Sequence, residues 1–311
     1  MVEVSYCIVN TGQRELLLRG LDAVAAERAR VPFATEVLVL DNASRDGSAV
    51  AARTHGTADA VIALAERRGK AENDTALLQR ASGRYCLLLN EDSELLPGAT
   101  TALRDALAER PRAAAAGARL RRPDGREQPS AWRFPGVGTA LAQALFLHRR
   151  LVVQSRGDAV RGVDWAQSAA LMVRRAAVAE VGWLDPEFFV YSDEVDLCKR
   201  LADAGWATVW VPAAEAIHHE GLSTGAGAER RIVELARNRE RYLRKHHGRV
   251  ATLLVRGLTA WAYAVRTVAA LALPGHDPRR YLRHVTATLR PGRGEGLREA
   301  AAAFNRVARG A

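Results

Sequence analysis

The stretch Tyr85-Cys-Leu-Leu-Leu-Asn-Glu-Asp-Ser-Glu94 decides the fold, because an unbroken apolar run ends there in polar residues. A run of this length bounded by polar residues is typical of a buried strand. Parallel α/β sheets bind ligands just beyond the carboxyl ends of their strands, so Asn90 and Asp92 lie where a ligand is expected. Alternate residues of an extended chain point the same way, and hard oxygen ligands suit Mg²⁺ or Mn²⁺. The alternative is a plain strand end, with Asp92 or Ser93 capping the next helix.

Strands and helices alternate on both sides of this stretch. Strands are predicted at the apolar runs Val4–Val9, Glu36–Asp41 and Ala60–Leu64. Helices are predicted over residues 14–30, 49–55, 67–81 and 97–110. This alternation is typical of a largely parallel sheet with crossover helices. The turn after the first strand lacks Gly-x-Gly-x-x-Gly, which disfavours a dinucleotide-binding fold.

The second half of the chain is less regular. Strands are expected over residues 113–120, 163–173 and 206–211, the last of them stopped by Pro212. Helices are expected over residues 141–153, 174–181 and 192–204. An aromatic-rich loop separates the last two helices, and residues 217–224 are predicted to form another loop.

Composition limits the class of protein. Hydrophobic residues make up 48% of the 311 residues, enough for a sizeable core. No early apolar run indicates a signal peptide, and no segment offers the roughly 18 uncharged apolar residues of a membrane span. The three cysteines, Cys7, Cys86 and Cys198, show no metal-ligand spacing, so buried free thiols in a reducing cytosol are expected.

Positive charge is concentrated near the end of the chain. Residues 229–311 contain 18 Lys and Arg against 6 Asp and Glu, a net charge of +12. The whole chain has a net charge of +10, so residues 1–228 have a net charge of −2. Helices are expected over residues 230–248 and 249–270. The second is amphipathic, with Arg256, Thr259 and Arg266 on one face and Leu254, Leu258 and Trp261 on the other. Such a helix lies on an anionic membrane surface, or packs against the catalytic domain or a second subunit. No nucleic-acid-binding signature accompanies the charge.

Four ordered blocks resemble glycosyltransferase family two, the inverting sugar-nucleotide transferases, and most of all its non-processive, rhamnosyltransferase-like branch. The blocks are Ser5–Thr11, Val39–Ser48, Leu88–Asp92 and Asp185–Arg200, and a weaker match is His218-x-x-Gly-x-Ser223. The third block stands where the family has an Asp-x-Asp or Asn-x-Asp metal motif. The fourth stands where the family has its catalytic base.

The resemblance implies roles for particular residues. Asp92 is the expected metal ligand, together with His218 or the adjacent His219. Asn90 supports the site, and Glu91 is expected to point away from its neighbours. The nucleotide side is expected to include Thr11, Asp41, Asn42, Ser44, Lys70, Asn73 and Asn90. For Asp41 the alternative is an N-cap of the following helix.

The catalytic base is expected in the pair Asp193-Glu194. A sugar hydroxyl is a poor nucleophile, so a carboxylate must accept its proton. Relatives often have Glu-Asp here, and this chain has the reverse order, so Glu194 matches by position and Asp193 remains the competitor. The alternative for both is a helix N-terminus complemented by acidic residues. Trp165 and Tyr191 are expected either to line the acceptor side or to pack in the core.

The fold implied by the resemblance is α/β, of the GT-A type, with a mixed, mostly parallel sheet flanked by helices and a C-terminal helical extension. The expected catalytic domain is 1–228, with a nucleotide-binding half at about 1–110 and an acceptor half at about 111–228, followed by a basic amphipathic extension at 229–311. The implied function is transfer of one sugar from a dTDP-, UDP- or GDP-linked donor to a hydroxyl of a glycan or lipid-linked glycan, with Mg²⁺ or Mn²⁺. This activity would serve polysaccharide synthesis for the cell envelope, in the cytoplasm or at the inner face of the cell membrane.

Two other functions compete with this one. A sugar-phosphate nucleotidyltransferase would need a Gly-rich, basic loop after the first strand, and Asn10-Thr-Gly-Gln-Arg14 does not supply it. A non-catalytic glycan- or partner-binding module would be expected to have a broken metal motif or to lack the base, and the sequence retains both.

Overall fold

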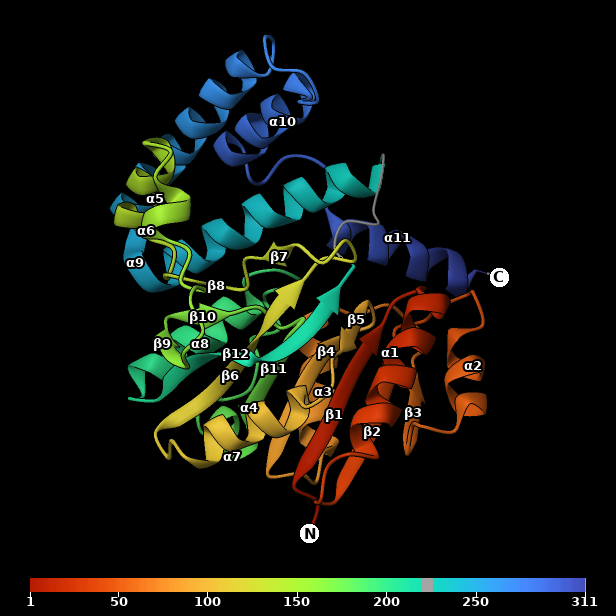
Figure 1. Ribbon diagram of the computed structural model, residues 1–311. Coiled ribbons are helices and arrows are strands. Elements are labelled where there is room, and N and C mark those ends of the chain that lie inside the picture. The colour runs from red at the N-terminus through yellow and green to blue at the C-terminus, as the bar shows by residue number, and fades with distance from the viewer. Residues whose placement is uncertain (220–225, 311) are drawn as a thin grey trace. The chain divides into compact units, whose positions relative to one another are not determined.

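The computed structural model describes residues 1–219 and 226–310, which form two compact units (Figure 1). The first unit comprises residues 1–132, 154–186 and 193–222, and the second comprises 133–153, 187–192 and 223–311. The second unit therefore includes two segments that lie, in sequence, within the first.

A ten-stranded mixed sheet forms the centre of the first unit. Its main path is β3 (Ala60–Ala63), β2 (Thr35–Asp41), β1 (Val4–Asn10), β4 (Tyr85–Asn90), β11 (Ala170–Arg174), β6 (Ala113–Arg121), β12 (Ala207–His218) and β5 (Ser93–Leu95). β7 (Glu127–Gln128) pairs with β6, and β9 (Arg161–Val163) pairs with β12. Six strands run in one direction, namely β1, β2, β3, β4, β6 and β12. The expected mixed, mostly parallel sheet is confirmed.

Helices cover both faces of this sheet, because alternate residues of its strands are apolar on both sides. In β1, Tyr6 and Ile8 belong to one buried cluster and Cys7 and Val9 to the other. The first cluster receives α1 (Arg14–Arg28), α2 (Ser48–His55) and α4 (Ala99–Ala108). The second receives α3 (Lys70–Arg80), α7 (Arg175–Glu180) and α8 (Asp193–Asp203). All three cysteines are free and buried, as expected.

Three element predictions for the second half of the chain are wrong. The segment 163–173 is not one strand, because it divides between the end of β9, β10 (Trp165–Ala166) and β11. Pro212 does not stop β12, which continues to His218 through a register shift between Val211 and Glu215, where a bulge accommodates the missing amide hydrogen. The helix expected over 141–153 is interrupted, since Phe146 has φ 59° between α5 (Val137–Ala144) and α6 (His148–Leu151).

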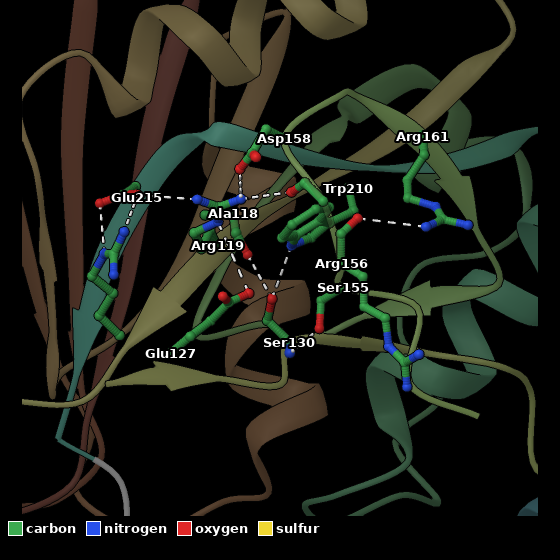
Figure 2. Close-up of polar contacts among 12 residues, drawn as sticks. Ala118, Arg119, Glu127, Ser130, Ser155, Arg156, Asp158, Arg161, Trp210 and Glu215 are labelled. Carbon is green, nitrogen blue, oxygen red and sulfur yellow. Dashed lines mark hydrogen bonds and ion pairs between the residues drawn. The ribbon is translucent and has the colours of Figure 1, made fainter. Parts of the chain in front are cut away.

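A buried polar network joins β6, β12 and the chain around residue 155 (Figure 2). The fully buried Trp210 donates from Nε1 to Ser130 Oγ at 3.0 Å, and Ser130 Oγ donates to Ala118 O at 2.9 Å. The Ser130 amide donates to Ser155 Oγ at 3.0 Å. Arg119 lies over the Trp210 ring and donates to Asp158 Oδ1 at 2.8 Å (Figure 2). These bonds anchor Ser130, which directly precedes the short β8 (Ala131–Trp132), and β8 pairs with β10.

The second unit is helical. It contains α5, α6, α9 (Ala226–Ala269), α10 (Pro278–Leu289) and α11 (Leu297–Arg309). Gly248 has φ 74° and breaks α9 into two helices, which matches the expected division at residue 248. Only glycine adopts this conformation without strain. Among the residues that the structure describes, none of the helices has the length and apolar character needed to cross a membrane.

Candidate active site

The turn after β2 closes over the carboxyl end of β1. Asn10 Nδ2 donates to Asp41 Oδ1 at 2.7 Å, and the Ser44 amide donates to Asp41 Oδ2 at 3.0 Å. The Ser44 hydroxyl accepts from the Gly12 amide at 2.8 Å. Both carboxylate oxygens of Asp41 are therefore engaged, one by Asn10 at the end of β1 and the other by the turn after β2. The alternative in which Asp41 caps α2 is wrong, since the N-cap residue is Gly47.

Thr11 and Asn42 lie at the same edge of the sheet. Asn42 Nδ2 donates to Thr11 Oγ1 at 3.3 Å and to Arg68 O at 3.0 Å, and Asn42 Oδ1 accepts from the Arg68 amide at 2.8 Å. The turn after β2 is thereby tied to the segment that opens α3. The structure thus brings together four of the residues expected on the nucleotide side, Thr11, Asp41, Asn42 and Ser44.

The carboxylates that follow β4 face this edge as well. Glu91 Oε1 accepts from the Thr11 amide at 3.3 Å. Burial, and then the negative charge of Asp92, raise the pKa of Glu91 to about 7. The expectation that Glu91 points away from its neighbours is wrong, because the chain turns at residues 91 and 92 instead of continuing as a strand.

The Asp92 carboxylate lies beside the His218 ring, whereas His219 reaches Asp92 through its backbone amide, which donates to the Asp92 carbonyl oxygen at 3.0 Å. His218 Nε2 is 3.4 Å from Asp92 Oδ1, and its Nδ1 is 3.2 Å from the Gln128 side-chain amide nitrogen. His219 Nε2 instead pairs with Glu94 Oε1 at 2.6 Å. The antiparallel pairing of β12 with β5 produces this difference, because it sets His218 opposite Ser93. The other residues of the weaker sequence match, Gly221 and Ser223, lie outside the described residues.

Lys70 connects the strand-end carboxylates to the start of α8. Its Nζ donates to Asp74 Oδ2 at 2.5 Å and to Ser168 Oγ at 3.2 Å. Burial lowers the pKa of Lys70, but the negative charges of Asp74, Asp193 and Glu194 outweigh burial and raise the pKa above its ordinary value. The Lys70 charge also lowers the pKa of Glu91. One ammonium group therefore interacts with carboxylates from both of the acidic motifs that the sequence singles out.

The pair Asp193-Glu194 begins α8, with a raised pKa at Glu194 and a left-handed backbone just before the pair. Burial, and then the charge of Asp193, raise the pKa of Glu194 well above its usual range. The two residues before the pair, Tyr191 and Ser192, have φ of 66° and 64°, a left-handed conformation that strains side chains larger than glycine. By contrast, Asp196 is fully buried and bound to Arg200, with Oδ2 2.8 Å from Nε, so it has a structural role.

Several buried polar atoms around this edge have no hydrogen-bond partner among the residues that the structure describes. They are both amide atoms of Asn73, Oδ1 of Asn90, Oγ of Ser93 and Oδ2 of Asp193. Buried polar groups in native proteins are nearly always paired, so a cluster of exceptions indicates atoms that are satisfied by a ligand, an ion or water. Asn73 and Asn90 are also among the residues expected on the nucleotide side.

The donor set around Asp92 fits a divalent cation that is shared with a ligand. Within residues 1–219 and 226–310, no group of three or more His, Cys, Asp or Glu side chains is placed to hold a metal ion. Asp92 and His218 provide one carboxylate and one imidazole. The unpaired Oδ1 of Asn90 belongs to the last residue of β4, two positions before Asp92. Mg²⁺ and Mn²⁺ commonly take one or two protein ligands and complete their shells with substrate phosphates and water.

The two aromatic residues expected on the acceptor side lie in different units. Trp165 belongs to the first unit and stacks on Trp132, with ring centroids 4.6 Å apart. Tyr191 belongs to the second unit, where its hydroxyl accepts from Arg231 Nε at 2.8 Å. No local sequence pattern marks Trp132 or Gln128, because their contacts arise from sheet pairing.

Comparisons with known proteins identify the family of this chain. Residues 5–157 match the family model described as Glycosyl transferase family 2. The chain is 34% identical over 222 residues to the N-acetylglucosaminyl-diphospho-decaprenol L-rhamnosyltransferase of Mycobacterium tuberculosis, covering 63% of this chain and 72% of that protein. The chain belongs to glycosyltransferase family 2. It is a glycosyltransferase, and the resemblance drawn from the sequence blocks is confirmed.

Solved structures place this family 2 member in the GT-A fold. A mannosyltransferase from Pyrobaculum calidifontis, in complex with GDP-Man and Mn²⁺, aligns with a TM-score of 0.59 at 18% identity, over 98% of this chain and 84% of that chain. Mannosyl-3-phosphoglycerate synthase from Rubrobacter xylanophilus aligns with a TM-score of 0.56 at 18% identity, over 80% of this chain and 76% of that chain. At these identities the likeness shows the fold, which is the one expected.

Proposed function

We propose that this family 2 glycosyltransferase moves one sugar from a nucleotide-sugar donor to a hydroxyl of a lipid-linked glycan, with inversion at the anomeric carbon. The observation that carries the proposal is the position of Lys70, whose charge acts on Glu91 beside the strand-end site and on Asp193 and Glu194 at the start of α8. A nucleotide-binding edge and a proton acceptor that feel the charge of the same ammonium group suit a single displacement. The Mycobacterium tuberculosis relative is named for a lipid-linked acceptor, which supports the acceptor class.

Different residues bind the donor, neutralise the leaving group and activate the acceptor. The donor nucleotide lies along the edge formed by Thr11, Asp41, Asn42, Ser44, Lys70, Asn73 and Asn90. Asp92 and His218 hold Mg²⁺ or Mn²⁺, which when bound neutralises the charge of the departing diphosphate. Glu194 accepts the proton of the attacking hydroxyl, with Asp193 as the competing base. Trp165 and Tyr191 belong to the acceptor side.

The raised pKa of Glu194 suits this role. A carboxylate that binds its proton more tightly is a stronger acceptor once it is ionised, and a general base works best when its pKa lies near the working pH. The Lys70 charge counteracts burial and lowers the pKa of Glu194. Catalysis is assigned to residues 1–228, with the nucleotide half at about 1–110 and the acceptor half at about 111–228, and residues 229–311 form an extension.

Turnover of donors tests the proposal. Release of nucleoside diphosphate is measured with dTDP-rhamnose, UDP-galactose, UDP-glucose and GDP-mannose, with Mg²⁺ or Mn²⁺ and a polyprenyl-diphosphate-linked sugar acceptor. Asp92→Ala and Glu194→Gln should each lose at least about a hundredfold in rate while keeping the melting temperature. Glu109→Gln, at an exposed position, is the matched control and should retain full activity.

Two results would contradict the proposal. Wild-type protein that turns over none of the four donors with the lipid-linked acceptor would remove the assigned reaction. Full activity in Glu194→Gln together with loss in Asp193→Asn would transfer the role of base to Asp193, and full activity in both variants would end the mechanism.

A further inference from the structure

The second half of α9, residues 249–269, turns its polar face toward its own unit. Thr252 and Thr259 are each only 1% exposed. The Tyr263 ring stacks on His284 of α10, with centroids 4.4 Å apart, and the Arg266 guanidinium lies 5.1 Å from the centre of the Phe146 ring. Figure 1 shows α5 and α10 beside this half of α9, and both contact it. The packed side of the helix therefore carries polar residues together with the buried Val255 and Ala262.

The opposite face of the same helix is apolar and faces solvent. Val250 is 74% exposed, Leu253 59%, Leu254 53%, Trp261 61% and Val268 68%. Their spacing of three, four and seven residues puts them on one side of a helix. We call these five residues the α9 stripe. A helix of a water-soluble protein normally leaves a polar face toward solvent, whereas the solvent face of this helix is apolar.

The stripe belongs to a wider concentration of exposed apolar side chains in the second unit. Of the nineteen large hydrophobic residues that are exposed among the described residues, fifteen fall within residues 137–151 and 250–289. Exposed apolar residues that are scattered singly need no explanation, whereas a concentration on one part of a protein marks an interaction surface. The unit therefore has an uncovered surface that needs a partner.

Charge identifies the partner. Residues 229–311 carry a net charge of +12. Exposed arginines lie before the stripe, at Arg244 and Arg249, and after it, at Arg279 and Arg280. A second copy of this chain would bring two such positive surfaces together, and the like charges would oppose association. An anionic lipid surface offers both the opposite charge and an apolar layer beneath it.

We propose that the α9 stripe docks this protein on an anionic membrane surface, with Leu254 and Trp261 inserted at the headgroup level. The proposal rests on the proposed function in one respect, since a lipid-linked acceptor is presented at such a surface. The stripe lies in the plane of the surface and does not cross it. The basic residues at its two ends bind lipid phosphates, and the polar face of the helix keeps its contacts with α5 and α10.

Vesicle flotation tests the docking directly, without donor or acceptor. The stripe variant carries Leu253→Gln, Leu254→Gln and Trp261→Gln. The matched control carries Val50→Gln, Leu235→Gln and Val307→Gln, which are also exposed, at 65%, 40% and 63%, but lie outside the stripe. Wild type and control should bind vesicles of phosphatidylcholine with about one third phosphatidylglycerol, and high salt should weaken that binding. The stripe variant should partition at least about tenfold less.

The outcomes separate docking from catalysis. The proposal is overturned if wild type does not bind anionic vesicles. It is also overturned if the stripe variant binds them as well as the control does. Sedimentation analysis showing that wild type is a dimer without vesicles and that the stripe variant is a monomer overturns it too, because the stripe would then be covered by a second copy. Donor turnover in detergent is measured on the same proteins and should be unchanged in the stripe variant. If wild type shows no donor turnover in detergent, the proposed function is contradicted, while the docking proposal is unaffected.

Discussion

Lys70 is the residue on which the charges of the site converge. It stands at the start of α3, and its neighbours in the fold explain how an ammonium group is tolerated there. Asp74, four residues later on α3, has a side chain only 2% exposed, and burial raises its pKa while Lys70 lowers it. Each member of the pair therefore offsets the cost of burying the other's charge.

Removing Lys70 should destabilise the protein and impair catalysis together. Lys70→Met leaves the buried Asp74 carboxylate without its counter-charge, and breaking a buried pair in this way costs about 3–5 kcal/mol. Urea denaturation of the single variant and of Lys70→Met combined with Asp74→Asn measures the effect. The double variant should recover part of the lost stability but not donor turnover. Equal stability of wild type and Lys70→Met would show that the pair contributes nothing.

At the scale of elements, the Trp210–Ser130–Ala118 network holds the segment that leads from β7 to β8 against β6 and β12 (Figure 2). Ser130→Ala should cost about 1–3 kcal/mol, because the buried Trp210 Nε1 loses its acceptor. Trp210→Phe removes the donor instead. Each single variant already breaks the bond between Trp210 Nε1 and Ser130 Oγ. The double variant should therefore lose less stability than the sum of the two single losses. Urea midpoints of the four proteins measure this coupling, and strictly additive losses would contradict it.

The packing of α10 on α9 should make stability depend on pH. Burial and the neighbouring guanidinium groups of Arg239, Arg280 and Arg266 lower the pKa of His284 to about 4. The unfolded chain takes up this proton near pH 6.5, so the unfolded state binds more protons between pH 6.5 and 4. The stability that comes from keeping His284 neutral in the folded protein is fully present above pH 6.5. It is lost as the pH falls from 6.5 to 4. The loss is on the order of 1–3 kcal/mol.

Melting temperatures across this pH range test the assignment. His284→Phe retains a ring against Tyr263 but cannot be protonated, so its melting temperature should fall less steeply than that of wild type from pH 6.5 to 4. His276→Phe, at an exposed position, is the control and should follow wild type. Identical slopes for wild type and His284→Phe would show that another group causes the acid sensitivity.

At the scale of the whole molecule, the second unit includes the segment that leads into Asp193 and Glu194, the pair proposed to contain the base. Residues 187–192 belong to this unit, and α9 holds them through hydrogen bonds. Asn238 Nδ2 donates to Val190 O at 2.8 Å, and Arg231 Nε donates to the Tyr191 hydroxyl at 2.8 Å. The left-handed backbone of Tyr191 and Ser192 is thus held by the same long helix that carries the α9 stripe. The helical extension therefore holds the backbone that leads into α8.

Much of this molecule follows from local pattern. Apolar runs predict β1, β2 and β4, because a buried strand must be apolar on both faces. Polar residues directly after those runs predict a binding edge, because the carboxyl ends of parallel strands meet there. The break at Gly248 follows from the glycine between two helical patterns. The C-terminal charge is likewise visible from composition alone.

The remainder needed the tertiary structure, because it depends on contacts between distant residues. The His218 ring lies beside the Asp92 carboxylate and the His219 ring beside the Glu94 carboxylate, although the two histidines are adjacent in sequence. The turn at residues 91 and 92 directs Glu91 toward Thr11, which alternation along a strand does not predict. The periodicity of α9 identified an apolar face, but only packing decided that residues such as Leu254 and Trp261 on that face stay exposed. Residue order determines what each segment can form, and the side on which a segment packs is determined by the segments around it.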